Sequence, residues 1–381
     1  MPVLKGGLRV EAIINRSAAP VRVVRRLGGR HVACEFRRCL SSKHFDSPEK
    51  PMPTSAQAPE NPLHPPTRPF AEEMLDVGQG HRLFIRQMGS EQAIPVLFLH
   101  GGPGSGCSPE HARLFDPARC RLILPDQRGS GRSTPAGGLA HNDLAHLIGD
   151  LESLRCHLGI EQWLIYGGSW GATLALEYSK SHPGRVLELI LRAPFLARQA
   201  DLDAFFGPQG VARLYPKAYA ALCEALSSAH GHDIVARLYA ALCAQADLDQ
   251  AYAAALALDH WEAAVMQVGA AAAQADPAER AARIARKRVY AHYCQQRFFL
   301  GENGVLEGLD RIAGIAVTIV HGEHDQVCPI DGSRLLVQEH LPHASLEPVA
   351  HAGHGLDRRE LQAALRQRID EALSRHGRSD A

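Results

Sequence analysis

Residues 163–171 of the chain have the sequence Trp-Leu-Ile-Tyr-Gly-Gly-Ser-Trp-Gly. Four apolar residues, a length suited to a buried strand, lead into a Gly-x-Ser-x-Gly turn, and the helix-forming run 172–178 follows. A strand, a sharp turn with a central serine and a helix form the context that exposes a serine hydroxyl as a nucleophile. The flanking glycines permit the tight turn and close packing of the helix on the strand. This stretch therefore predicts an α/β protein with Ser169 at the end of a central strand.

Short apolar runs alternate with helix-length segments on both sides of this stretch. The expected strands are 96–99, 121–124, 163–166, 188–191, 317–320 and 345–349, and the expected helices include 144–158 and 172–181. Such alternation is typical of a mostly parallel sheet with helices on both faces. Residues 81–86 precede the first apolar run, and we expect them in an antiparallel hairpin at the edge of the sheet.

The alternation stops after Pro194, because residues 196–299 are rich in alanine and contain no convincing strand. We expect an all-helical cap above the carboxyl edge of the sheet, where ligands bind in such folds. The expected division is a disordered leader and Pro-rich linker at 1–67, the first part of the core at 68–195, the cap at 196–299 and the second part of the core at 300–381.

The overall composition limits the classes of partner. The chain has 381 residues, with 41 Lys and Arg against 41 Asp and Glu, and 45% of its residues are hydrophobic. This is typical of a soluble globular protein. A net charge of zero argues against nucleic acid as an obligate partner, because phosphate binding needs a concentrated basic surface. No run of about 18 apolar residues occurs, so we expect no membrane partner. The oligomeric state is left open.

The spacing of the cysteines and the lack of cofactor-binding motifs argue against a bound cofactor. The nine cysteines are scattered and contain no Cys-x-x-Cys pair, which argues against a zinc site and a disulfide framework. No phosphate-binding loop and no His-Glu-x-x-His motif occur. We therefore expect no cofactor and no metal. Because no secretory signal peptide is evident, we expect a cytoplasmic protein.

The first 50 residues differ in charge from the rest, with 11 Lys and Arg against 4 Asp and Glu. An organelle-targeting segment has this Arg-rich, acid-poor character, but no clean amphipathic face is present. Residues 47–69 are rich in Pro, Ser and Ala, as in an extended linker. We expect a disordered or mis-started leader, with Met52 as the candidate start and a targeting role as the alternative.

Two later strand ends carry the partners that a nucleophilic serine requires. A serine hydroxyl needs a neighbouring base, and after such an elbow the partners follow in the order Ser, Asp or Glu, then His. Asp325 comes just after the expected strand 317–320, and His354 comes just after the expected strand 345–349. We expect Asp325 to orient the imidazole of His354, which acts as general base and then as general acid.

Other residues compete for these two roles. His351 is the alternative base, although Gly353 directly before His354 permits the tighter approach to the serine. Asp331 is the alternative carboxylate, but it follows Pro329 and is expected on the next helix. We interpret Glu323 and His324 as solvated loop residues.

The sequence His-Gly-Gly-Pro-Gly at 100–104 follows the expected strand 96–99. Glycines there leave backbone N–H groups uncovered, so the amides of Gly102 and Trp170 are expected to form an oxyanion hole. One such donor stabilises the transition state by about 3–4 kcal/mol. Residues 126–133 follow another strand, and we interpret them as a structural turn held by ion pairs of Asp126 and Arg128, with a substrate contact as the alternative.

These motifs together resemble the proline iminopeptidases (prolyl aminopeptidases) of the α/β-hydrolase fold. The likeness extends from about Leu63 to about Gly355. It rests above all on His-Gly-Gly-Pro-Gly at 100–104, Asp-Gln-Arg-Gly-Ser-Gly-Arg-Ser at 126–133 and Gly-Gly-Ser-Trp-Gly at 167–171. This combination, in this order, is highly specific to that family. The resemblance implies metal-free removal of an N-terminal proline, with Ser169, Asp325 and His354 as the triad.

The resemblance also implies which cap residues bind the free amino terminus. Glu262 in Trp-Glu matches the family's first glutamate, and a buried ammonium needs such a carboxylate. Tyr290 occupies the place of the second glutamate and would serve as a neutral hydrogen-bond acceptor. The alternative is that Glu262 and Tyr290 are ordinary helix residues of a variable cap. Arg192, Phe195 and Phe205 match residues that line the proline pocket. Ala-Pro at 193–194 departs from the usual Gly-Ile. This departure and Tyr290 in place of a glutamate affect the expected substrate specificity and not the hydrolytic residues.

We therefore expect a serine hydrolase that releases an N-terminal residue, proline above all, from peptides or small amides. An esterase, a lactonase or an aminopeptidase of altered specificity on the same scaffold is the alternative. A catalytically silent binding protein is a third possibility, since a fold does not fix a function. Epoxide hydrolases and dehalogenases share the fold but use aspartate where this chain has Ser169.

Overall fold

The computed structural model describes residues 25–27, 30–32 and 61–377, except residues 228, 230, 232, 245–246 and 270–274. Strands β1 (Arg25–Leu27) and β2 (Arg30–Val32) form an antiparallel pair of their own. The rest of the expected leader up to residue 60 lies outside the described residues. In residues 61–67, Pro62 O accepts a hydrogen bond from Arg366 at 2.9 Å, His64 N donates to Arg113 O at 2.8 Å, and His64 O accepts from Arg113 Nε at 2.9 Å. Residues 61–67 are therefore part of the folded domain rather than of a linker.

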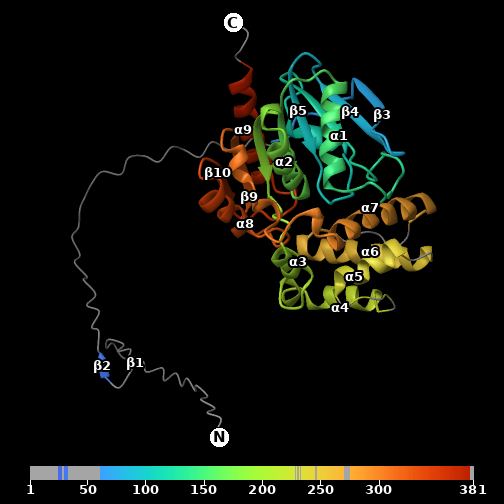
Figure 1. Cartoon of the computed structure of the whole chain (residues 1–381), viewed down its shortest axis with the longest axis vertical. Helices are drawn as coiled ribbons and strands as arrows, with labels where there is room; N and C mark the ends of the chain where they lie inside the picture. Colours follow the sequence, from blue (N-terminus) through green and yellow to red (C-terminus); the bar gives the residue numbers. More distant parts are fainter. Residues whose placement is uncertain are drawn as a thin grey trace. The chain divides into compact units, whose positions relative to one another are not determined.

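Eight strands form one sheet in the order β10-β9-β8-β7-β5-β6-β4-β3 (Figure 1). The strands are β3 (Ala71–Asp76), β4 (Arg82–Gly89), β5 (Ile94–Leu99), β6 (Cys120–Pro125), β7 (Trp163–Gly168), β8 (Val186–Arg192), β9 (Ala316–Gly322) and β10 (Ser345–Val349). β4 pairs antiparallel with β3 and with β6, and the remaining pairs are parallel. The mostly parallel sheet and the edge hairpin predicted from the sequence are confirmed.

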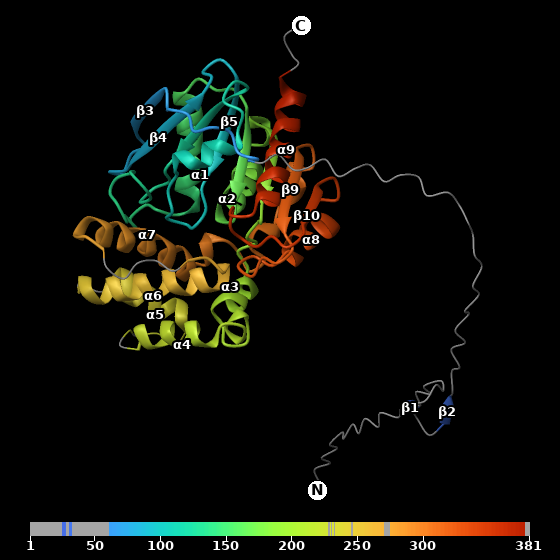
Figure 2. The ribbon, with the colours of Figure 1, turned by 180° about the vertical axis from the view of Figure 1, so that it is seen from behind.

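Successive residues of the central strands enter two separate cores. In β5, Val96 and Phe98 belong to one core, whereas Leu97 and Leu99 belong to the other. This alternation follows from the two-residue period of a strand. Helices α1 (Leu144–His157) and α2 (Trp170–Ser181) cover one face, and α9 (Arg359–His376) covers the opposite face (Figure 2). Helices therefore lie on both faces, as predicted.

The described residues between β8 and β9 contain helices and loops and no strand. The longer helices are α3 (Gln199–Phe206), α4 (Pro216–Ala225), α5 (Ile234–Tyr239), α6 (Leu248–Met266) and α7 (Pro277–Gln295). They lie together on one side of the α/β core (Figure 1). Asp247 and Asp276 cap the N-termini of α6 and α7 through hydrogen bonds to backbone amides, which explains where these two helices begin. We refer to residues 199–295 as the cap.

No helix in the described part of the chain has the length and apolarity that a membrane crossing requires.

Candidate active site

The turn between β7 and α2 holds Ser169 in a strained backbone conformation. Its φ of 56° and ψ of −123° lie outside the regions that L-residues prefer. The turn is fixed by a hydrogen bond from Ser169 N to Arg192 O, at 2.9 Å. A Cβ at Gly171 would lie 2.1 Å from Leu99 O, and a Cβ at Gly167 would lie 2.4 Å from Gly171 O. Only glycine fits at these two positions, so the motif in the sequence is a steric requirement.

Asp325 and His354, predicted from the ends of two strands, are in direct contact. Asp325 Oδ2 lies 2.7 Å from His354 Nδ1. Asp325 is 3% exposed, and its Oδ1 accepts hydrogen bonds from the backbone amides of Val327 and Cys328, both at 2.8 Å. Burial raises the pKa of the Asp325 carboxyl, but the nearby His354 charge and hydrogen bonds from His321 and His354 outweigh it, so the pKa is lowered. The carboxylate is therefore charged and holds the His354 ring with Nδ1 protonated.

Asp325 has a further neighbour, His321, to which the sequence analysis gave no role. The His321 ring is fully buried, with Nε2 2.8 Å from Cys328 O and 3.4 Å from Asp325 Oδ2. Its Nδ1 lies 2.7 Å from Ser333 Oγ. Because Nε2 donates to Cys328 O, Nδ1 is unprotonated and accepts a hydrogen bond from the Ser333 hydroxyl. The ring is therefore held in one tautomer. The only sequence signal for this residue is its place at the end of the same strand that leads to Asp325.

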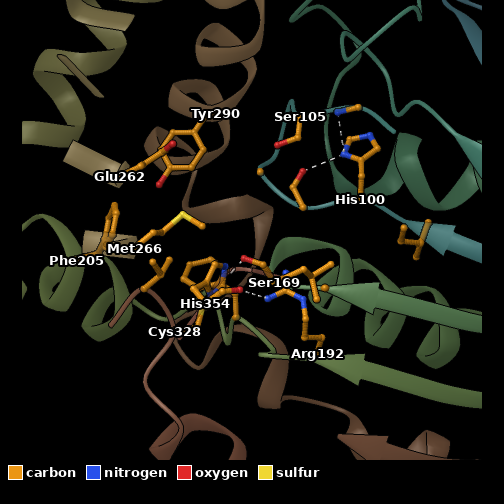
Figure 3. Close-up of a pocket in the computed structure, with 18 of the residues that line it drawn as sticks. His100, Ser105, Ser169, Arg192, Phe205, Glu262, Met266, Tyr290, Cys328 and His354 are labelled. Carbon is orange, nitrogen blue, oxygen red and sulfur yellow. Dashed lines mark hydrogen bonds between the residues drawn. The ribbon is translucent and has the colours of Figure 1, made fainter. Parts of the chain in front are cut away.

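A cavity of about 290 Å³ lies over the carboxyl ends of β5, β7 and β8, and both Ser169 and His354 line it (Figure 3). Among the described residues, the Ser169 hydroxyl has one polar side-chain contact, at 4.0 Å from Cys328 Sγ. Burial raises the pKa of the Cys328 thiol well above its usual value, so this neighbour is a neutral thiol. No hydrogen bond joins the Ser169 hydroxyl to His354 in the described part of the chain, although both side chains line the same cavity.

The competing residues lie elsewhere. His351 is exposed, and its ring contacts that of His324 with centroids 5.4 Å apart. Asp331 begins helix α8 (Asp331–Leu335), has an 83% exposed side chain and pairs with Arg334 at 2.8 Å. Neither residue lines the cavity that holds Ser169.

Backbone amides are available where an oxyanion hole was expected. Gly102 lines the cavity with a φ of 110°, and a Cβ there would lie 2.9 Å from Gly104 N and from Ser105 Oγ. Trp170 is the first residue of α2, and the first N–H groups of a helix have no partner within it. In the described part of the chain, neither amide donates to another protein group. Both are therefore free to donate to a substrate oxygen.

A chain of hydrogen bonds connects these two elements. His100 Nε2 accepts from Gln127 N at 3.0 Å, and Gln127 Nε2 donates to His100 O at 3.0 Å. The Trp170 indole donates to Gln127 Oε1, also at 3.0 Å. Since His100 Nε2 is an acceptor, its Nδ1 carries the proton and donates to Gly101 O at 2.9 Å. Gln127 therefore ties the glycine loop to the serine turn.

One expectation for the turn after β6 is wrong. Arg128 does form an ion pair, with Asp150, at 2.6 and 2.7 Å. Asp126, in contrast, forms no ion pair among the described residues and accepts hydrogen bonds from the backbone amides of Cys107 at 2.5 Å and Arg132 at 2.8 Å. Two backbone donors satisfy this buried carboxylate in place of a cation.

The structure brings the expected specificity residues into the same cavity, which is lined by Arg192, Phe195, Phe205, Glu262 and Tyr290. Arg192 Nη1 donates to His354 O at 2.5 Å, so this arginine also supports the loop that carries the imidazole (Figure 3). Figure 3 shows Glu262 and Tyr290 on the cap side, across from Ser169. Burial raises the pKa of the Tyr290 hydroxyl well above its usual value, so it is neutral.

Within the described ranges, no group of three or more His, Cys, Asp or Glu side chains is arranged to hold a metal ion.

Comparison with known proteins places this geometry in a family. Residues 94–356 match the sequence model of the α/β-hydrolase fold. The chain is 38% identical over 297 residues to a proline iminopeptidase of Xylella fastidiosa (strain 9a5c), covering 77% of this chain and 93% of that protein. It is also 38% identical over 306 residues to a proline iminopeptidase of Arabidopsis thaliana, covering 80% of each.

Solved structures with lower identity share the fold. The crystal structure of a proline iminopeptidase of Mycobacterium smegmatis matches with a TM-score of 0.52 and 20% identity, covering 80% of this chain and 99% of that one. An esterase of Exiguobacterium antarcticum matches with a TM-score of 0.53 and 19% identity, covering 79% and 99%. At these identities the likeness shows the fold alone.

Proposed function

The chain belongs to the proline iminopeptidase family of the α/β-hydrolase fold, and on that premise we propose that it is a serine peptidase that releases an N-terminal proline from peptides and small amides. The observation that carries the proposal is the 2.7 Å contact between Asp325 and His354 beside the cavity that Ser169 lines. Charged Asp325 and its hydrogen bond to Nδ1 leave His354 Nε2 as the basic atom.

The proposed reaction has two steps. His354 takes the proton of the Ser169 hydroxyl as the oxygen attacks the scissile carbonyl carbon, and the amides of Gly102 and Trp170 stabilise the oxyanion. Collapse breaks the C–N bond, and His354 gives its proton to the leaving amine. A water molecule, deprotonated by His354, then attacks the acyl-enzyme and releases proline with Ser169 restored.

Recognition of the amino end is assigned to the cap. Glu262 lines the cavity across from Ser169, and its carboxylate is the partner proposed for the ammonium of the substrate. The aromatic rings of Phe195 and Phe205 line the same space and provide apolar contact for a pyrrolidine ring. Peptides with a blocked amino terminus would lose the ion pair with Glu262.

An esterase is the second candidate, and Tyr290 favours it because a neutral hydroxyl stands where the family has a carboxylate. Esters need no recognition of an amino terminus. Hydrolysis of a nitrophenyl ester series, compared with prolyl anilide, separates the candidates. Efficient cleavage of acetyl and butyryl esters beside poor cleavage of prolyl anilide would favour the esterase.

The direct test uses prolyl, alanyl and acetylprolyl p-nitroanilides with the wild type and Ser169→Ala. We expect prolyl anilide to be cleaved fastest, acetylprolyl anilide to be cleaved poorly, and activity to disappear in Ser169→Ala together with labelling by a fluorophosphonate. Equal cleavage of the free and acetylated substrates would overturn the aminopeptidase assignment. Full labelling of Ser169→Ala would overturn the role of the serine.

We further propose a cytoplasmic location. The seven cysteines in the described residues are all free thiols, which fits a reducing compartment.

A further inference from the structure

Glu262, proposed to bind the ammonium of the substrate, already has a cation beside it. Lys287 Nζ lies 2.5 Å from Glu262 Oε2 and 3.0 Å from Asp259 Oδ1. The Lys287 side chain is 4% exposed, whereas that of Glu262 is 27% exposed. The same Nζ lies 5.6 Å from the centre of the Tyr290 ring. An ammonium group of the protein itself therefore occupies one of the two oxygens of this carboxylate.

Lys287 and Ser169 line different cavities that share Glu262. A second cavity, of about 120 Å³, lies next to the first, and Lys287 lines only this second one. Glu262 and Tyr290 line both cavities, so they form part of the wall between them. Lys287 therefore holds Oε2 of Glu262, whereas no described residue donates a hydrogen bond to the other oxygen, which is available to a ligand.

The other carboxylate that lines the first cavity is also paired. Arg198 donates to Asp201 at 2.7 and 3.0 Å. Arg192 lines the cavity as well, so the lining residues and their partners carry three positive charges on arginine and lysine against two negative charges. Including the buried carboxylate of Asp325 brings this balance to zero. An incoming ammonium therefore meets no net negative charge, and it approaches Lys287 as a like charge.

We propose that Lys287 is a specificity-determining residue that weakens the preference of the site for acyl groups with a charged amine. The inference rests on the proposed function, in which Glu262 is the partner of that amine. The substrate class that follows is amides with a compact five-membered acyl group, in which a protonated ring nitrogen adds less to binding than it would beside an unpaired Glu262. Cyclopentanecarbonyl amides, which have the ring of proline without its nitrogen, are then discriminated against less strongly by the wild type than by a variant without the Lys287 charge.

The test compares prolyl and cyclopentanecarbonyl p-nitroanilides at pH 7, where most of the amine is protonated. We measure the ratio of kcat/KM for the two substrates in the wild type and in Lys287→Met. Methionine retains most of the apolar length of the side chain, and Asp259 keeps its ion pairs with Arg283 and Arg286 at 3.0 and 2.8 Å, so folding is expected to persist. Lys287→Gln serves as a second variant, with the melting temperature of both recorded.

We expect Lys287→Met to raise the prolyl to cyclopentanecarbonyl ratio by about tenfold, the lower end of what a hydrogen bond to a charged group contributes. The change should appear in KM of the prolyl substrate. The double variant with Glu262→Gln should lose this gain, because the cycle isolates the coupling of Lys287 to Glu262. Arg286→Gln is the matched control, since it removes a cation of the same cluster that pairs with Asp259 and not with Glu262.

A ratio that stays constant or falls in Lys287→Met and Lys287→Gln would overturn the inference and would mean that Lys287 holds Glu262 in place for binding. An equal rise in Arg286→Gln would also overturn it, because the effect would then follow from total charge. The proposed function fails separately, if the wild type cleaves neither prolyl anilide nor prolyl peptides in a reaction that depends on Ser169.

Discussion

The two sides of the cavity are held in different ways. On the sheet side, strand ends and backbone hydrogen bonds position Ser169, Asp325 and the glycine loop, and a Cβ at Gly171 would collide with Leu99 O. On the cap side, Glu262 and Tyr290 project from two helices, and their surroundings depend on side chains such as Lys287. We therefore infer that backbone geometry mainly positions the proposed reacting groups, whereas side-chain pairing mainly sets the proposed selectivity.

This contrast predicts different kinetic effects of substitutions on the two sides. Changes on the sheet side should lower kcat or destabilise the fold, because they disturb reacting groups or main-chain geometry. Changes on the cap side should alter KM and substrate ratios with little effect on kcat.

The largest effect is expected for Asp325→Asn. An asparagine at this place can present its amide NH₂ to His354 Nδ1, which favours the wrong tautomer of the imidazole. We expect kcat for prolyl anilide to fall by about 10⁴-fold, as for the same change in other serine triads. Steady-state kinetics measures it, with Asp331→Asn on the exposed start of α8 as the matched control. Retention of more than a tenth of the activity would contradict the assignment of Asp325.

Gly171→Ala should disturb both the fold and the reaction. The new Cβ would meet Leu99 O at 2.1 Å and His100 O at 2.9 Å, both of them backbone atoms, so α2 has to move away from β5. We expect the free energy of unfolding to fall by about 3 kcal/mol, the upper part of the usual range for overpacking. Displacement of the serine turn should lower kcat by about 100-fold.

The measurement for Gly171→Ala is urea unfolding together with prolyl anilide kinetics. Gly149→Ala is the matched control, because a Cβ at that position of α1 meets nothing within 4 Å. Normal stability and kcat in Gly171→Ala would show that the turn is not sterically fixed.

His111, on the sheet side of the cavity, should make stability depend on pH. Burial lowers its pKa to about 4, with the charges of His100 and Arg192 acting in the same direction and Glu110 opposing. As the pH falls from 6.5 to 4, His111 binds a proton in the unfolded chain but stays neutral in the folded protein. Its contribution to the free energy of unfolding is therefore fully present above pH 6.5 and is lost on acidification. The loss by pH 4.5 should be about 2 kcal/mol.

Urea unfolding at pH 7 and pH 4.5, in the wild type and in His111→Phe, measures this contribution. Phenylalanine retains the stacking of His111 on Phe98, where the ring centroids are 4.8 Å apart. The variant should lose less stability on acidification, although it lacks the acceptor for Ser108 N. An equal loss in both proteins would mean that other buried histidines account for the whole pH dependence.

The sequence was sufficient to predict the sheet side, because strand lengths, glycine spacing and the order of Ser169, Asp325 and His354 all reflect backbone constraints. Apart from the contact between Asp325 and His354, which the order of the strands indicated, it was insufficient where a contact joins side chains of separate elements. Lys287 and Glu262 lie on different helices, and the packing of α6 against α7 brings them together. For the same reason, the bridge made by Gln127 and the packing of His321 against Asp325 could not be derived from spacing alone.

The smallest effect is expected for Tyr290→Phe, which separates the hydrogen bond of the neutral Tyr290 hydroxyl to the substrate amine from the ion pair at Glu262. The ring should remain in place, because it packs against Phe206 with centroids 6.3 Å apart. We expect KM for prolyl anilide to rise by about tenfold, the lower end of what a hydrogen bond with one charged partner contributes, with kcat unchanged. The cyclopentanecarbonyl substrate has no amine to receive that bond, so its KM should stay the same. A fall in kcat for both substrates would instead place the hydroxyl at the reacting centre, and the division between a catalytic sheet side and a selective cap side would fail at Tyr290.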